Sequence, residues 1–146
     1  MASTGYCFSA ASPPYFSTAA LEAIKRIEDS SNLTQQVLVN SKIMESELKA
    51  KLPKKVTFAT SAVTIPIFHI KLADSMIDVK KSATLMSEIA AKALQQGVAV
   101  VAPKYNERDR SQPAPSIRLT VSANHTEADI KQGVQILANV IQQVIA

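Results

Sequence analysis

Ile117-Arg118-Leu119-Thr120-Val121-Ser122-Ala123-Asn124-His125-Thr126-Glu127-Ala128-Asp129-Ile130 is the stretch in which the hydrophobic period changes, and it decides the fold. Its first five residues alternate apolar with polar side chains, which predicts a strand with one apolar face. Thr126 and Asp129 then form a capping-box pattern with Asp in the usual Glu or Gln place, which predicts a helix start. The apolar residues of that last helix recur at helical spacing: Ile130, Val134, Leu137, Ile141 and Val144.

Upstream, the same reading predicts two helices, two strands, a third helix and a further short strand. The helices run from within 15–19 to about 28, from a cap in 30–32 to Pro53, and from a cap at Ser82 to Gly97 at the C′ position; the strands contain 56–58, 68–72 and 98–102. A loop is expected over 103–115. The order ααββαββα predicts an α/β (α+β) domain, with a small antiparallel or mixed sheet and helices over one face.

Composition narrows the classes of function. With 146 residues, 47% of them hydrophobic, the chain can bury one core. Basic residues are scattered in pairs and do not form a stripe, so a nucleic-acid partner is not expected. No apolar run approaches the roughly 20 residues that cross a bilayer, and no secretory signal is visible at the start. The single Cys7 excludes an internal disulfide, and we interpret it as a buried thiol.

Few residues are candidates for chemistry. Arg118 belongs on the second face of its strand, where it is either an exposed arginine or a planar fork for a carboxylate or phosphate. His69 is expected to be structural, on the sheet face opposite Phe68. His125, just before the last helix, either bonds backbone or lines a site. No spacing supports a metal site, a catalytic triad or a glycine-rich phosphate loop.

Two strings carry a family resemblance. Gly5-Tyr6-Cys7-Phe8-Ser9-Ala10-Ala11-Ser12-Pro13-Pro14-Tyr15 resembles a segment of the lysine-free subunits of serine palmitoyltransferases, and Pro115 to Thr126 resembles an Arg-x-x-x-Ser-Ala-x-His-Thr/Ser segment shared by α-oxoamine synthases. The strand Thr64 to Leu72 is similar as well. The resemblance covers essentially the whole chain. It implies the C-terminal small domain of a fold-type-I transferase over residues 15–146, preceded over 1–14 by the extended end of a large domain.

The resemblance also implies a function. Such enzymes condense serine with palmitoyl-CoA, in the first step of sphingoid-base synthesis, at the cytosolic face of the endoplasmic reticulum. A lysine-bearing partner subunit holds pyridoxal phosphate covalently, and the lysine-free subunit completes the site as a heterodimer. On this sequence Ser9 and Ala10 match the positions that reach the phosphate of the partner's cofactor, and Arg118 matches the residue that contacts the substrate carboxylate.

The first of these two segments departs from the family where Ser-Ala-Ser-Leu reads Ser9-Ala10-Ala11-Ser12, so one hydroxyl has either moved or been lost. No lysine stands in a position typical of a Schiff-base lysine, so no catalytic residue is assigned and the polypeptide alone is expected to be inactive. Two alternatives stay open. The chain is either the same domain of a catalytic homodimeric α-oxoamine synthase, or a free-standing small α/β binding module.

Overall fold

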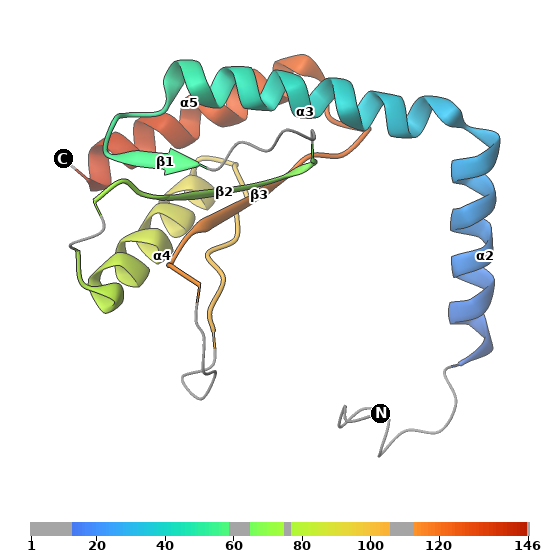
Figure 1. The fold of residues 1–146 in the computed structure, drawn as a ribbon, viewed down its shortest axis with the longest axis horizontal. Coiled ribbons are helices and arrows are strands. Elements are labelled where there is room, and N and C mark those ends of the chain that lie inside the picture. Colours follow the sequence, from blue (N-terminus) through green and yellow to red (C-terminus); the bar gives the residue numbers. More distant parts are fainter. Residues whose placement is uncertain (1–12, 59–64, 75–76, 106–112, 146) are drawn as a thin grey trace. The chain divides into compact units, whose positions relative to one another are not determined.

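The computed structural model of the chain describes residues 13–58, 65–74, 77–105 and 113–145. The contacts within the chain divide it into two compact units, a first unit of residues 1–35 and a second unit of residues 36–146. In the described residues the order is α2 (Pro14–Asp29), α3 (Ser31–Lys51), β1 (Val56–Phe58), β2 (Ile67–Leu72), α4 (Val79–Gln95), β3 (Ile117–Thr120) and α5 (Glu127–Val144) (Figure 1).

The first unit is built on α2. Pro14 occupies its first turn, where a missing N–H costs nothing, and Arg26 pairs with Glu22 one turn earlier at 2.9 Å. The helix has no buried residue, and its apolar side chains are exposed. The helix predicted for this part of the sequence is present in the structure.

The second unit contains an antiparallel sheet in the order β1-β2-β3, as predicted from the alternation. Phe58 is opposite Ile70 across the first pair of strands, and Phe68 is opposite Leu119 across the second. Side chains alternate across the pleat, so Ile117 and Leu119 are buried while Arg118 and Thr120 are exposed. One face of the sheet is thus apolar and the other polar.

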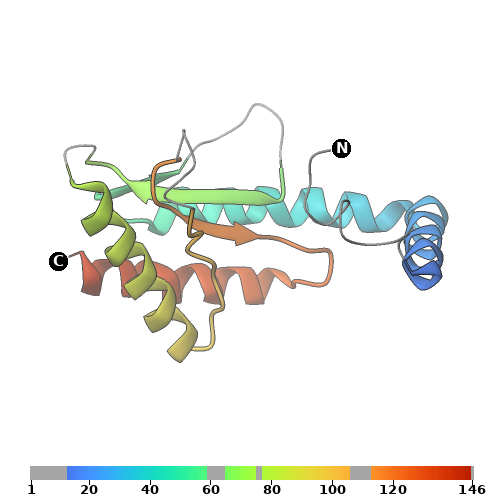
Figure 2. The ribbon, with the colours of Figure 1, turned by 90° about the horizontal axis from the view of Figure 1, so that it is seen from below.

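In the second unit, the described helices pack on the apolar face of the sheet. Buried side chains of the second unit form a single cluster with the strands; from the helices it takes Met44 and Leu48 of α3, Met86, Ile89 and Ala93 of α4, and Ile130, Val134, Leu137, Val140 and Ile141 of α5. Within this unit α3 lies alongside α5 in both views (Figures 1 and 2), and the Lys51 Nζ donates to the Lys131 carbonyl at 3.4 Å. The expected α+β architecture with helices over one face is confirmed.

One element of the predicted order is reduced to a single bridge. Val101 pairs with Arg118 through both backbone hydrogen bonds, at 3.3 and 2.7 Å, but the rest of 98–102 forms no strand. The next hydrogen-bonded position along this edge falls on Pro103, which has no N–H to donate. The order ααββαββα is therefore wrong by one strand: the described residues give ααββαβα.

The start of α4 also differs from the prediction. Asp78, not Ser82, caps the helix, because its carboxylate accepts from the N–H groups of Lys80 and Lys81. Ser82 lies one turn inside and is buried. An aspartate accepts capping hydrogen bonds at least as well as a serine. Because Asp78 lies one turn before Ser82, the helix that it caps is longer by one turn than predicted.

The end of α4 is as predicted. Gly97 has φ of +84°, and the N–H groups of Gly97 and Val98 bond back to the carbonyls of Leu94 and Ala93 at 3.0 and 2.9 Å. This is a Schellman motif with glycine at C′.

Candidate functional site

β3 holds Arg118 on the exposed face of the sheet. Its flanking residues Ile117 and Leu119 are fixed in the core, so the pleat turns the Arg118 side chain away from the helices, as the sequence predicted. His69 of β2 lies directly opposite Arg118 on the same face. The His69 Nδ1 is 3.1 Å from the hydroxyl of the buried Ser116, a contact that fits the structural role expected for this histidine.

The turn between β3 and α5 is locked by hydrogen bonds. The Thr126 hydroxyl accepts from the Asp129 N–H at 3.1 Å, and the Asp129 carboxylate accepts from the Thr126 hydroxyl at 2.7 Å and from the Thr126 N–H at 2.9 Å. These donors, the hydroxyl first, lower the pKa of Asp129. The capping box predicted with aspartate is therefore present.

His125 is an exposed residue within this turn. Its Nδ1 accepts from the Ser122 N–H at 3.2 Å, so the ring bonds backbone as one of the two interpretations expected. The other interpretation is compatible, because His125 also borders a cavity.

The side chain of Asn40, on α3, makes hydrogen bonds to this turn. The side chain is buried, and its amide donates to the carbonyls of Ser122 and His125 at 2.9 and 2.7 Å. Its oxygen accepts from the Gln36 amide at 2.9 Å, which satisfies the polar side chain. Sequence reasoning missed this residue, because a polar residue in a helix reads as a surface position when its partners are 82 and 85 positions away.

A cavity of about 350 Å³ lies between α5, the edge of β3 and the segment 97–101. Arg118, His125 and Asp129 are among its lining residues, together with apolar groups from α5. Two predicted site residues, Arg118 and His125, are therefore brought to one place. The alternation of β3 still sends the Arg118 guanidinium toward the polar face, while Leu119 faces the core.

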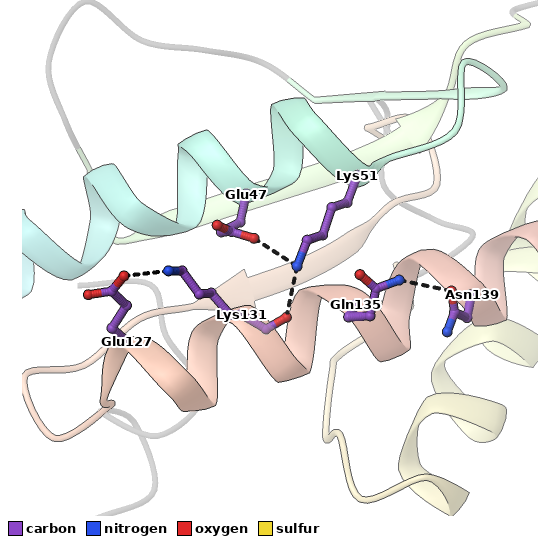
Figure 3. Close-up of polar contacts among 6 residues, drawn as sticks. All are labelled: Glu47, Lys51, Glu127, Lys131, Gln135 and Asn139. Carbon is purple, nitrogen blue, oxygen red and sulfur yellow. Dashed lines mark hydrogen bonds and ion pairs between the residues drawn. The ribbon is translucent and has the colours of Figure 1, made fainter.

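The described residues do not fit a covalently held pyridoxal phosphate, the cofactor that the resemblance implies. A Schiff-base lysine needs a lowered pKa, whereas the hydrogen bond and charge of Glu127 raise the pKa of Lys131. Lys51 is paired in a similar way with Glu47, at 2.8 Å (Figure 3). No lysine is among the described residues that line the cavity, so no chemical step is assigned to the cofactor on this chain.

The remaining expectations concern the N-terminal residues, metal binding and membrane spans. Ser9, Ala10 and Cys7 lie outside the described residues. Across the part of the chain that the structure describes, no group of three or more acidic, histidine or cysteine side chains could hold a metal ion. No helix in the same part is long and apolar enough to cross a bilayer.

Solved structures share this fold. A variant of serine palmitoyltransferase from S. paucimobilis superimposes with a TM-score of 0.72 at 19% identity, over 94% of this chain and 31% of that one. The 8-amino-7-oxononanoate synthase of Francisella tularensis gives a TM-score of 0.66 at 22% identity, over 97% and 37%. The fold is thus that of a fold-type-I pyridoxal-phosphate enzyme, a class whose cofactor is pyridoxal phosphate.

Sequence comparisons give the family. The profile "Aminotransferase class I and II" matches residues 1–137, so the chain belongs to the class I and II aminotransferase family. It is 30% identical over 146 residues to Long chain base biosynthesis protein 1b of Oryza sativa subsp. japonica, and 28% identical over 137 residues to Serine palmitoyltransferase 1 of Dictyostelium discoideum. These alignments cover 99% and 91% of this chain but only 30% and 29% of the relatives. The resemblance drawn from the sequence is confirmed.

Proposed function

We propose that the chain is the C-terminal domain of a lysine-free subunit of serine palmitoyltransferase. In this role it supports the pyridoxal-phosphate site of a lysine-bearing partner subunit in a heterodimer. The whole enzyme condenses serine with palmitoyl-CoA in the first step of sphingolipid synthesis, at the cytosolic face of the endoplasmic reticulum. The observation that carries the proposal is the 30% identity, along 99% of the chain, to Long chain base biosynthesis protein 1b of Oryza sativa subsp. japonica.

Residues 1–14 then form the end of the large domain, and 15–146 form the small domain. Ser9 and Ala10 approach the phosphate of the partner's cofactor, where a small side chain and backbone N–H groups permit close contact. Arg118 binds the carboxylate of the substrate through its planar fork. His125 borders the cavity between β3 and α5, and Asn40 positions the turn that carries His125 through two hydrogen bonds to that turn.

No transferase activity is expected from the chain alone. The reaction requires a lysine with a lowered pKa next to the cofactor ring. Four of the described helical lysines, Lys49, Lys51, Lys92 and Lys131, make ion pairs of 2.6–2.8 Å with glutamates one turn earlier. An ammonium group held at a carboxylate of its own helix is not positioned against a cofactor ring.

The test is co-expression of the 146-residue chain with a lysine-bearing serine palmitoyltransferase subunit. We expect the two to co-purify, and we expect no ketone product from serine and palmitoyl-CoA with the chain alone. Arg118→Gln should weaken serine binding to the complex, measured by the cofactor absorbance, while Arg26→Gln on the exposed face of α2 serves as the matched control. Product formation by the isolated chain would overturn the proposal, and so would failure to bind the partner subunit.

The alternatives predict different results in this assay. A domain from a catalytic homodimeric α-oxoamine synthase would associate with itself and ignore the added subunit. A free-standing binding module would be indifferent both to the subunit and to pyridoxal phosphate.

A further inference from the structure

Three basic side chains gather on the polar face of the sheet. The register places His69 directly opposite Arg118, and Lys71 lies two residues along β2 from His69 on the same face. Opposite residues in antiparallel strands have Cβ atoms about 5 Å apart, and residues two apart on one strand are separated by roughly 7 Å. All three groups can therefore reach a single small ligand.

The sheet supplies no acidic partner to this group. Its other described outward-facing residues are Thr57, Ile67 and Thr120, and no ion pair or side-chain hydrogen bond to Arg118 or Lys71 occurs among the described residues. Every ion pair of the described part lies within a helix, between residues four apart, as for Glu127 and Lys131 in Figure 3. Arg26, Lys49, Lys51, Lys92 and Lys131 are thus paired on their own helices, whereas no described acidic side chain is paired with Arg118 or Lys71 on the sheet.

His69 is held in place next to these cations. Its Nδ1 is bound to the buried Ser116 hydroxyl, and its Nε2 has no partner among the described residues. A tethered ring loses little freedom when it binds a ligand, so it adds a pre-organised donor beside the two flexible cations.

We propose that Arg118, Lys71 and His69 form a binding site for a small diphosphate or phosphate-ester anion. The planar guanidinium takes two oxygens of one phosphate, the Lys71 ammonium compensates a second negative charge, and the imidazole donates one further hydrogen bond. A single carboxylate would leave one of the two cations uncompensated. The Arg118 fork holds one such ligand at a time, so this anion and the substrate carboxylate of the proposed function would compete for it, and the inference does not rest on that function.

The experiment is isothermal titration of the 146-residue chain with inorganic pyrophosphate, at low and at moderate salt. We expect Arg118→Gln to raise the dissociation constant for pyrophosphate about tenfold or more, since hydrogen bonds to charged groups contribute enough for such a factor. Lys71→Gln should raise it several-fold, and His69→Gln by less. Lys92→Gln is the matched control, because it removes the same charge from a helix where Glu88 pairs with it at 2.8 Å.

Acetate, as a lone carboxylate, should compete poorly with pyrophosphate for the wild-type chain. The proposal is overturned if the chain does not bind pyrophosphate, if Lys71→Gln binds it as tightly as the wild type, or if Lys92→Gln weakens it equally. All variants change outward-facing side chains, and their melting curves check that they fold. Because the titration needs no partner subunit, its failure is distinguishable from failure of the heterodimer proposal.

Discussion

Replacement of Asn40 by alanine removes a buried side chain that ties α3 to the turn between β3 and α5. Two donated hydrogen bonds are lost, to the carbonyls of Ser122 and His125. Each contributes about 1 kcal/mol net, and alanine returns roughly 0.5 kcal/mol through its higher helix propensity. With the packing lost at a fully buried position, the free energy of unfolding should fall by about 2 kcal/mol.

That change corresponds to a melting temperature lower by roughly 6–9 °C for a domain of this size. Urea unfolding followed by circular dichroism measures it directly. Asn139→Ala is the matched control, because Asn139 is exposed on α5 and bonds only Gln135, one turn earlier, at 3.1 Å (Figure 3). If the two variants differ by less than about 0.5 kcal/mol, Asn40 does not hold the turn and the reasoning fails.

Gly97→Ala should destabilise the fold by about 1 kcal/mol, because its φ of +84° is unfavourable for alanine even though a Cβ would meet open space. Gly133→Ala, with open space and a helical backbone, should stabilise it by up to about 1 kcal/mol, so opposite shifts in melting temperature check the pair. Ile89→Ala should cost about 3 kcal/mol in urea unfolding, because the side chain is fully buried, while Leu94→Ala, with Leu94 63% exposed, should cost well under 1 kcal/mol. Because the pKa of Asp129 is lowered by folding, its stabilising contribution is present at neutral pH and is lost as the pH falls through that lowered pKa. The difference in stability between wild type and Asp129→Ala should therefore shrink below about pH 4, as unfolding at several pH values will test.

Local signals in the sequence were sufficient for most elements of the fold. Alternation of apolar residues identified β3, the Thr126 and Asp129 pair identified the start of α5, and Gly97 identified the end of α4. Each signal involves only a few neighbouring residues, so it can be recognised without knowledge of the tertiary structure.

Errors arose where two local signals compete or where a partner is distant. The apolar run 98–102 is typical of a strand, but Pro103 removes the next ladder donor and leaves the Val101 bridge. Asp78 and Ser82 are both good caps one turn apart, and pattern alone does not rank them.

The anion site is the part of the fold that spacing alone could not give. Arg118 was singled out on its strand, but His69 and Lys71 are 49 and 47 positions earlier, and only the register of β2 against β3 brings them beside it. On a helix a glutamate four residues away neutralises a lysine, and the sequence itself records the pair. On a sheet the compensating charge must come from a neighbouring strand or from a ligand. Since the other described strand residues that face outward beside Arg118 and Lys71 are neutral or basic, we assign the missing negative charge to a bound anion.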